Sequence, residues 1–250
     1  MSAPGIYLAP PQLSVLATSP WYRYLTRVQR LRVGDRVRLL DGRGGQRDAV
    51  LTHVDKTGLR FEAGPTTVRP PLESELILCP ALLPHKRMDW LIEKVTELGV
   101  DVIQPISTQH TSVPAPTDDL PERLARWSRK ASEAVRQSGR QALPEIRPPC
   151  SLTALLEAWA TEQAKDSSSI IVWLDPEGAP ALPTHSPGGR WRLLLGPEGG
   201  WSEGERCALR ATGPVSLCIS PHTLRAETAA MSAVAVCSFL LGRHAKAPQT

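Results

Sequence analysis

The residues best placed to do chemistry stand in the segment 195–200, whose sequence is Leu-Gly-Pro-Glu-Gly-Gly. The leucines at 193–195 predict a buried strand, and Ser202 with Glu205 predicts a capping box that starts a helix. A strand that ends in glycines exposes backbone N–H and C=O groups at its carboxyl end, where open α/β sheets bind ligands. Glu198 would repel a pyrophosphate and the G-x-G-x-x-G spacing is absent, so a dinucleotide is disfavoured. A tight turn that binds nothing explains the same residues equally well.

A second charged segment, residues 219–229, has the sequence Ile-Ser-Pro-His-Thr-Leu-Arg-Ala-Glu-Thr-Ala. It predicts a strand end, a turn, and then Arg225 and Glu227 at the start of a helix that is otherwise almost entirely apolar. Residues at i and i+2 do not face each other on a helix, so we expect these two side chains to have different partners. Taken alone, Glu227 is explained by its favourable interaction with a helix dipole. Two strand-ending loops with charged residues, near each other in one sheet, favour a site.

An alternation of strands and helices must position these segments. The apolar run 76–82 predicts a strand covered on both faces, and residues at helical spacing from Met88 to Leu98 predict a helix that Gly99 ends. With the segment Val100-Asp101-Val102-Ile103 they form a βαβ unit. Further strands are expected at 170–174, 192–195 and 215–219, and helices at 119–138, 151–164, 202–211 and 224–241. The stretch from Pro176 to Gly189, rich in Pro, Gly and Ser, is expected to be a surface loop.

The first 70 residues have a different texture, with short apolar stretches between turn signals. They predict β structure that closes as a small barrel, in which Val37 and Leu39 alternate with arginines along one strand. Prolines at 70 and 71 break this pattern. We therefore expect a domain of residues 1–72 and a second of residues 73–250.

The net charge follows the same division. The whole chain carries +4, but residues 1–72 hold 11 Lys and Arg against 5 Asp and Glu, a net of +6, which leaves −2 for the remainder. A small basic domain joined to a slightly acidic one suggests contact with a polyanion, most often nucleic acid. A general preference for arginine, with 23 Arg against 6 Lys, explains the asymmetry equally well.

The composition excludes several classes of protein. The chain has 250 residues, 41% hydrophobic and 22% charged, as globular proteins do, and its most apolar stretch, 229–241, is too short for a membrane span. The N-terminus lacks the regions of a secretory signal, so a cytoplasmic location is expected. Five scattered cysteines with no C-x-x-C pair predict reduced core thiols, with neither a disulfide framework nor a metal site.

Together the two charged segments resemble those of a known family. Leu195 to Gly200 and Leu224 to Ala229 are similar to the signature segments of the ribosomal RNA small-subunit uridine N3-methyltransferases, members of the SPOUT superfamily. Further segments match in the same order, namely Arg87-Met88-Asp89-Trp90, Glu97-Leu98-Gly99-Val100, Gln137-Ser138-Gly139-Arg140 and Pro144-Glu145-Ile146. The resemblance covers nearly the whole chain. It lapses at Thr108-Gln109, where the family often has Glu-Arg, and at Arg136-Gln137, where Glu-Gln is usual.

The resemblance implies an α/β fold class, a SPOUT-type α/β knot domain with a deep C-terminal trefoil knot behind an N-terminal PUA-like β-barrel that binds RNA. It also implies a homodimer, and S-adenosylmethionine held by the knot loops. The residues carried over as cofactor-binding are Leu174, Leu195, Gly196, Pro197, Glu198, Gly199, Gly200, Leu217, Ile219, Ser220, Leu224, Arg225, Thr228 and Ala229.

The reaction that the resemblance implies is methylation of N3 of a uridine in 16S ribosomal RNA, either free or in the small ribosomal subunit. We predict that Arg225 donates hydrogen bonds to a uracil oxygen and stabilises the anion left when N3 loses its proton. Glu227 is predicted to be the base or an orienting group, although an acid near a helix N-terminus is a weaker base. The predicted RNA contacts are Arg23, Arg27, Arg30, Arg32, Arg36, Arg38 and Arg140.

Other functions stay open at this point. A noncatalytic RNA-binding or ribosome-assembly factor could retain the fold, and a SPOUT methyltransferase could act at a different RNA position. Ribose 2′-O-methylation is disfavoured because the ribose-modifying relatives rely on an Asn-containing segment, and this chain contains no Asn. A nucleotide-dependent oxidoreductase lacks its fingerprint here.

Overall fold

The structure, a computed structural model, describes residues 5–7, 13–41, 45–68, 74–113, 119–140, 142–163, 169–179 and 189–243. They form two compact units. The first contains residues 1–71 together with 135–143, and the second contains residues 72–134 and 144–250. Residues 135–143, which the expected boundary at 72 placed in the larger domain, are thus grouped with the smaller unit.

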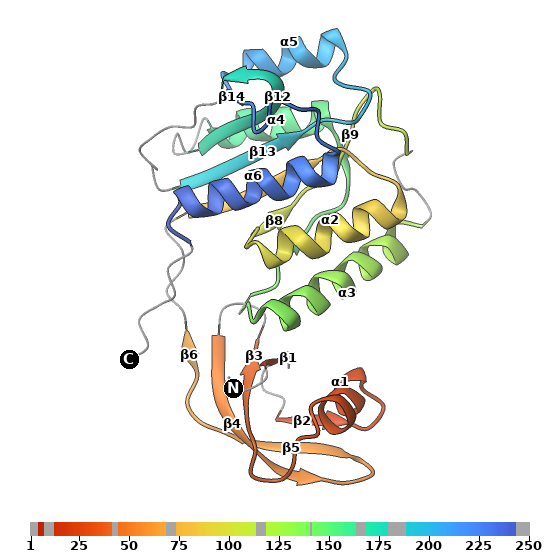
Figure 1. Cartoon of the computed structure of the whole chain (residues 1–250), viewed down its shortest axis with the longest axis vertical. Helices are drawn as coiled ribbons and strands as arrows, with labels where there is room; N and C mark the ends of the chain where they lie inside the picture. Colours follow the sequence, from red (N-terminus) through yellow and green to blue (C-terminus); the bar gives the residue numbers. More distant parts are fainter. Residues whose placement is uncertain are drawn as a thin grey trace. The chain divides into compact units, whose positions relative to one another are not determined.

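The first unit is built on one curled sheet (Figure 1). Its strands are β1 (Gly5–Tyr7), β2 (Ser14–Leu16), β3 (Arg36–Leu40), β4 (Gly45–Val54), β5 (Gly58–Ala63) and β6 (Thr67–Val68). The order is β1-β3-β4-β5-β2, with β6 paired to β4, so the sheet curls from β1 at one edge to β2 at the other. The short helix α1 (Pro20–Arg23) leads directly into a π-helical turn, η1 (Tyr24–Val28).

Buried and exposed side chains alternate along the strands of this sheet, and the buried ones form a core. Val37 and Leu39 of β3 are buried, while Arg36, the first residue of the same strand, is exposed. Leu51 of β4 and Leu59 of β5 join them inside the curl, and Leu25 of η1 fills the same core. The alternation of apolar and arginine residues predicted for β3 is confirmed.

The second unit contains a parallel sheet of six strands. They are β7 (Ser74–Pro80), β8 (Val102–Ile103), β10 (Glu145–Ile146), β12 (Ser169–Ala179), β13 (Gly189–Leu195) and β14 (Val215–Leu217), in the order β10-β8-β7-β13-β12-β14. A separate parallel pair joins β9 (Ile106–Ser107) to β11 (Cys150–Ser151). The helices are α2 (His85–Glu97), α3 (Leu120–Ser138), α4 (Leu152–Gln163), α5 (Glu203–Ala211) and α6 (Ala226–Leu240).

Helices cover both faces of this sheet, as Figure 1 shows. Leu76 and Leu78 of β7 pack into one cluster with residues of α2, α3 and α6. Ile77 and Cys79, on the alternate face, pack with residues of α4 and α5. The continuous apolar run of β7 is therefore buried on both sides, as predicted.

Most expected elements are present, with two differences at the ends of strands. The predicted loop from Pro176 is wrong in its first part, because β12 continues to Ala179, which pairs with Leu217 after a register shift. Residues 180–188 of that loop lie outside the described residues. The predicted strand 215–219 ends at Leu217, and the last helix begins at Ala226, so residues 218–225 form a loop between them.

The following findings concern the classes of protein and of site that the composition excludes. None of the helices in the described residues is long and apolar enough to cross a membrane. All five cysteines are free, and Cys79 and Cys237 are buried. Cys207 is exposed on α5, so the prediction of a core thiol is wrong for this residue. No group of three His, Cys, Asp or Glu side chains able to hold a metal occurs among the described residues.

Candidate active site

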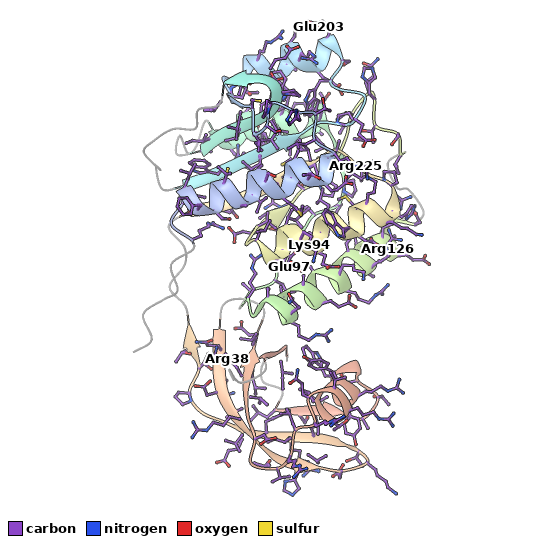
Figure 2. The ribbon with its side chains drawn as sticks, in the orientation of Figure 1. Arg38, Lys94, Glu97, Arg126, Glu203 and Arg225 are labelled. Atoms are coloured by element: carbon purple, nitrogen blue, oxygen red, sulfur yellow. The ribbon has the colours of Figure 1, made fainter. Side chains whose placement is uncertain are left out.

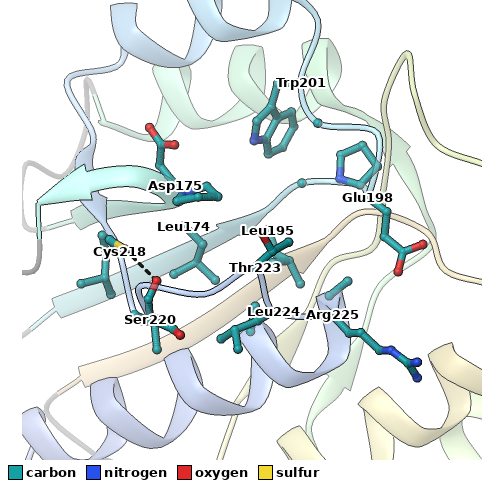
Figure 3. A pocket seen from close by; sticks show the side chains of 18 of the residues that line it. Leu174, Asp175, Leu195, Glu198, Trp201, Cys218, Ser220, Thr223, Leu224 and Arg225 are labelled. Carbon is teal, nitrogen blue, oxygen red and sulfur yellow. Dashed lines mark hydrogen bonds between the residues drawn. The ribbon is translucent and has the colours of Figure 1, made fainter.

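Three loops at one edge of the parallel sheet enclose a cavity of about 400 Å³ (Figure 3). They are the bulge of β12 after Leu174, where its pairing register shifts, the segment after Leu195 that ends β13, and the loop 218–225 that joins β14 to α6. The β12 and β13 residues Leu174 and Leu195 are direct neighbours in the sheet. The cavity thus lies at the carboxyl edge of the sheet, where α/β folds bind their ligands.

Glycines fix the path of the loop after β13, residues 196–201, called the glycine loop below. A Cβ on Gly196 would lie 2.7 Å from Cε2 and Nε1 of Trp201, so the indole ring occupies the space of a side chain. Gly200 has φ +72°, in the left-handed region, and its N–H donates to the Pro197 carbonyl at 2.9 Å. The predicted tight turn is confirmed, and glycine is required at both positions.

The predicted capping box at the end of the glycine loop is also confirmed. The Glu205 N–H donates to Ser202 Oγ at 3.4 Å, and the Ser202 N–H donates to Glu205 Oε2 at 2.9 Å. The start of α5 is therefore fixed by both residues of the box.

The cavity brings the two predicted segments together. All residues predicted to bind a cofactor line it except Gly199 and Thr228. The lining also contains Trp201 and Arg206, which follow the signature segment and were not predicted. Asp175, next to Leu174, lines the cavity as well, and its Oδ2 accepts a hydrogen bond from Ser216 Oγ at 3.3 Å.

Arg87 of α2 connects the two signature segments. Its Nε donates to Glu227 Oε2 at 3.0 Å, and its Nη2 lies 2.8 Å from Glu198 Oε1 and also contacts Glu227. The hydrogen bonds to Glu198 and then Glu227 raise the pKa of Arg87. One guanidinium therefore ties the glycine loop to the first turn of α6. Sequence spacing could not identify this role, because Arg87 precedes both partners by more than a hundred residues.

The environment of Glu227 keeps its carboxylate ionised. The side chain is 11% exposed, and burial alone would raise its pKa. Hydrogen bonds from Arg87 and from the backbone, together with the charges of Arg87 and Arg225, outweigh burial and lower the pKa of Glu227. The pKa of the more exposed Glu198 is lowered as well, chiefly by its hydrogen bond with Arg87. Neither carboxylate is tuned to accept a proton near neutral pH.

Arg225 stands at the N-cap of α6, with an extended backbone (φ −64°, ψ 151°) and an exposed side chain (Figure 2). Figure 3 shows its guanidinium and the Glu198 carboxylate on the same side of the cavity. In the part of the chain that the structure describes, no carboxylate forms an ion pair with Arg225. Its different environment from that of Glu227 agrees with the expectation of different partners, and its donors remain available to a ligand.

The predicted RNA contacts lie in the first unit as the structure groups it. Arg23, Arg27, Arg30, Arg32 and Arg36 are exposed, and Arg38, labelled in Figure 2, lies 3.5 Å from Asp48. Arg30 has φ 53°, in the left-handed region that non-glycine residues rarely adopt. Arg140 is partly buried and belongs to the segment 135–143.

In the same segment, the Arg136 guanidinium stacks on aromatic rings. It lies 4.6 Å from the ring centre of Tyr24 and 5.3 Å from that of Trp21. These cation–π contacts hold residues 135–143 within the first unit.

Comparison with known proteins agrees with this geometry. The family model described as RNA methyltransferase domain matches residues 70–238, and the one described as RNA methyltransferase PUA domain matches residues 22–63. The ribosomal RNA small subunit methyltransferase E of Synechocystis is 30% identical over 240 residues, which cover 94% of this chain and 77% of that protein. Its counterpart in Mycobacterium tuberculosis is 28% identical over a match that covers 86% of this chain and 82% of that protein.

Solved structures show the same architecture. The methyltransferase E of Neisseria gonorrhoeae, crystallised with S-adenosylmethionine, aligns with a TM-score of 0.79 at 26% identity, over 96% of this chain and 98% of that one. A putative methyltransferase of Legionella pneumophila, also in complex with S-adenosylmethionine, aligns with a TM-score of 0.77 at 25% identity. The alignment covers 96% of this chain and 98% of that one. The predicted fold class, a SPOUT-type α/β knot domain with an N-terminal PUA-like barrel, is confirmed. The chain belongs to the ribosomal RNA small subunit methyltransferase E family of the SPOUT superfamily.

Proposed function

We propose that this protein uses S-adenosylmethionine to methylate N3 of one uridine in 16S ribosomal RNA, as a step of rRNA processing in ribosome biogenesis. The observation that carries the proposal is the cavity at the sheet edge, with the exposed guanidinium of Arg225 beside it. The family relationship supports the reaction class, and the chemistry of the site supports a uracil base as the group that is methylated.

The cavity suits the cofactor. Leucine side chains from the strand ends give it apolar walls for an adenine, and the Asp175 carboxylate offers acceptors for hydroxyl or ammonium groups. The close contact of Trp201 with Gly196 keeps the glycine loop free of a side chain at that point. When bound, S-adenosylmethionine supplies an electrophilic methyl group. The residues that would hold it are those of the three loops.

We assign Arg225 the role of stabilising the substrate anion. Uracil presents carbonyl oxygens on both sides of N3, and negative charge moves onto them when N3 loses its proton. A guanidinium whose donors are not engaged by protein carboxylates can bind one of these oxygens and stabilise that charge. Of the two roles predicted for Glu227, base and orienting group, we propose the second. Its lowered pKa and its bond to Arg87 make it a weak base and a good anchor.

The RNA must present an unpaired base, since N3 of a paired uracil is engaged in the base pair. We propose that the basic residues 1–72 hold the RNA through Arg23, Arg27, Arg30, Arg32, Arg36 and Arg38, helped by Arg140. We retain residues 1–72 and 73–250 as the proposed domains. The substrate would place the protein in the cytoplasm.

We also propose a homodimer. Along α6, Val236 is 40% exposed and Leu240 is 37% exposed, so this helix carries a small apolar patch at the surface. Burial of such a patch against a second copy stabilises a dimer. Light scattering after gel filtration tests this, and a mass of a single 27.2 kDa chain at micromolar concentration would contradict it.

Mass spectrometry of 16S ribosomal RNA from cells that lack this protein tests the proposed reaction. We expect one N3-methyluridine to be missing and to return with the wild-type chain. At saturating S-adenosylmethionine, the Arg225→Ala variant should methylate at least about a hundredfold more slowly than the wild type, because it lacks the group that stabilises the anion. Survival of every methyluridine without the protein would refute the reaction. A wild-type chain that binds no S-adenosylmethionine would favour a noncatalytic RNA-binding factor.

A further inference from the structure

A turn outside the predicted site contacts the glycine loop from the side. This turn, Thr108–Thr111, follows β9 and is called the clasp turn here. The Thr111 N–H donates to the Thr108 carbonyl at 3.2 Å, the Thr108 N–H donates to Thr111 Oγ1 at 2.9 Å, and the two hydroxyl oxygens are 2.7 Å apart. β9 is itself paired to β11, and the Leu82 N–H donates to the Ile106 carbonyl at 2.9 Å. The clasp turn is therefore a closed turn on a fixed strand.

His110 of the clasp turn bonds two carbonyl groups of the glycine loop. Its Nδ1 lies 3.2 Å from the Gly199 oxygen and 3.1 Å from the Gly200 oxygen. Both partners are acceptors, so Nδ1 must carry the hydrogen and donate. A Cβ on Gly199 would lie 3.0 Å from His110 Cβ, so the histidine packs against a position that has no side chain.

The residue before His110 holds the other end of the same segment. The Gln109 N–H donates to Glu205 Oε1 at 2.8 Å, while Glu205 Oε2 is engaged in the capping box of α5. Two consecutive residues of the clasp turn thus bond both sides of residues 199–205.

We propose that His110 is a positioning residue of the cofactor site. The inference rests on the proposed function, in which the glycine loop holds S-adenosylmethionine. Because a peptide group is planar, a hydrogen bond to the Gly199 and Gly200 carbonyls also fixes the N–H groups of Gly200 and Trp201 in the same planes. Gly200 and Trp201 both line the cavity. A loop that is already ordered binds its ligand more tightly, since less conformational freedom is lost on binding.

Calorimetry with S-adenosylmethionine on full-length variants tests this role. His110→Ala should weaken binding roughly tenfold, the effect of one lost hydrogen-bond donor. His110→Asn should stay within about twofold of the wild type, because the asparagine amide offers an N–H donor near the position of Nδ1. Gln109→Ala is the matched control, since Gln109 bonds Glu205 through its backbone, and should bind as the wild type does.

Hydrogen exchange in the cofactor-free protein gives an independent measurement. His110→Ala should speed exchange of the amides at 199–201, and His110→Asn should restore their protection. Wild-type affinity and unchanged exchange in a folded His110→Ala variant would overturn the inference. If His110→Ala does not fold, His110→Asn tests the inference in its place. A folded His110→Asn variant that binds S-adenosylmethionine several times more weakly than the wild type overturns the inference. One that binds S-adenosylmethionine normally supports it. A wild-type chain that binds no cofactor refutes the proposed function, while the exchange experiment still tests the clasp.

Discussion

At the scale of single residues, Arg87 is the group on which the geometry of the site depends most. It bonds one carboxylate from each signature segment, and Glu227 is mostly buried while Glu198 is 58% exposed. Loss of the guanidinium leaves a buried carboxylate with its main partner removed, which is costly, whereas the exposed pair contributes little. The site therefore depends on Arg87 chiefly through Glu227.

The first prediction follows from this asymmetry. Arg87→Met keeps an unbranched aliphatic side chain but removes the guanidinium, and should lower the free energy of unfolding by about 2 kcal/mol, because Glu227 loses its charged donor. Glu198→Gln, which affects only the exposed partner, should cost less than about 1 kcal/mol. Urea unfolding of both variants checks the difference. Equal losses of unfolding free energy in the two variants would show that the bond from Arg87 to Glu227 contributes no more than the bond from Arg87 to Glu198.

A second prediction concerns pH. The pKa of Glu227 is lowered in the folded protein, so its contribution to stability is fully present above the unfolded pKa of about 4.3 and is lost as pH falls through the folded value. Unfolding free energies measured from about pH 6 down to about pH 3, which brackets that pKa by roughly 1.5 units on either side, should therefore decline less steeply in Glu227→Gln than in the wild type. Parallel curves would contradict the assignment.

At the scale of elements, the capping box of α5 also bonds the clasp turn. Glu205 accepts hydrogen bonds from Ser202 with one oxygen and from the Gln109 N–H with the other, so it joins a helix start to the clasp turn. Ser202→Ala removes only the cap and should lower the free energy of unfolding by about 1 kcal/mol. Glu205→Ala removes both connections and should cost about 2 kcal/mol. Chemical denaturation distinguishes them, and equal losses would mean that the Gln109 contact adds nothing.

The elements also show what sequence patterns can predict. Helices α2 and α3 and strand β7 begin and end within three residues of their predicted limits, because apolar periodicity and Gly99 act locally. The strand predicted at 170–174 is shorter than β12, because Pro176 and Gly178 suggest a turn. The structure uses Gly178 instead for close approach, since a Cβ there would lie 2.5 Å from Ser216 Oγ in β14.

The site follows the same rule. The glycine loop and its capping box are local features, and the sequence predicts both. The roles of Arg87 and His110 are not local, because each side chain reaches a loop far away in the sequence. Spacing rules relate residues within one helix or strand, and they say nothing about which helix will pack beside which loop.

At the scale of the whole molecule, the division of charge matters more than its sum. Since the positive charge is concentrated in residues 1–72, we expect RNA affinity to fall steeply with salt. Changing the exposed residues Arg27, Arg30 and Arg32 to Gln should weaken binding of a 16S ribosomal RNA fragment and reduce the slope of log affinity against log salt by about 2. Filter binding between about 50 and 200 mM salt measures the slope. S-adenosylmethionine affinity, the control, should not change. An unaltered slope would mean that the RNA is held elsewhere.

The position of the cavity along the chain has a consequence for synthesis. Its lining comes from residues 174–176, 195–206 and 217–229, all in the last third of the sequence. A nascent chain therefore has no complete cofactor site until its final helix has left the ribosome. At about 5–20 residues per second, the earlier parts have several seconds to fold before that happens. The cavity is therefore completed only after residues 1–173, which include the whole basic N-terminal part, have been synthesised.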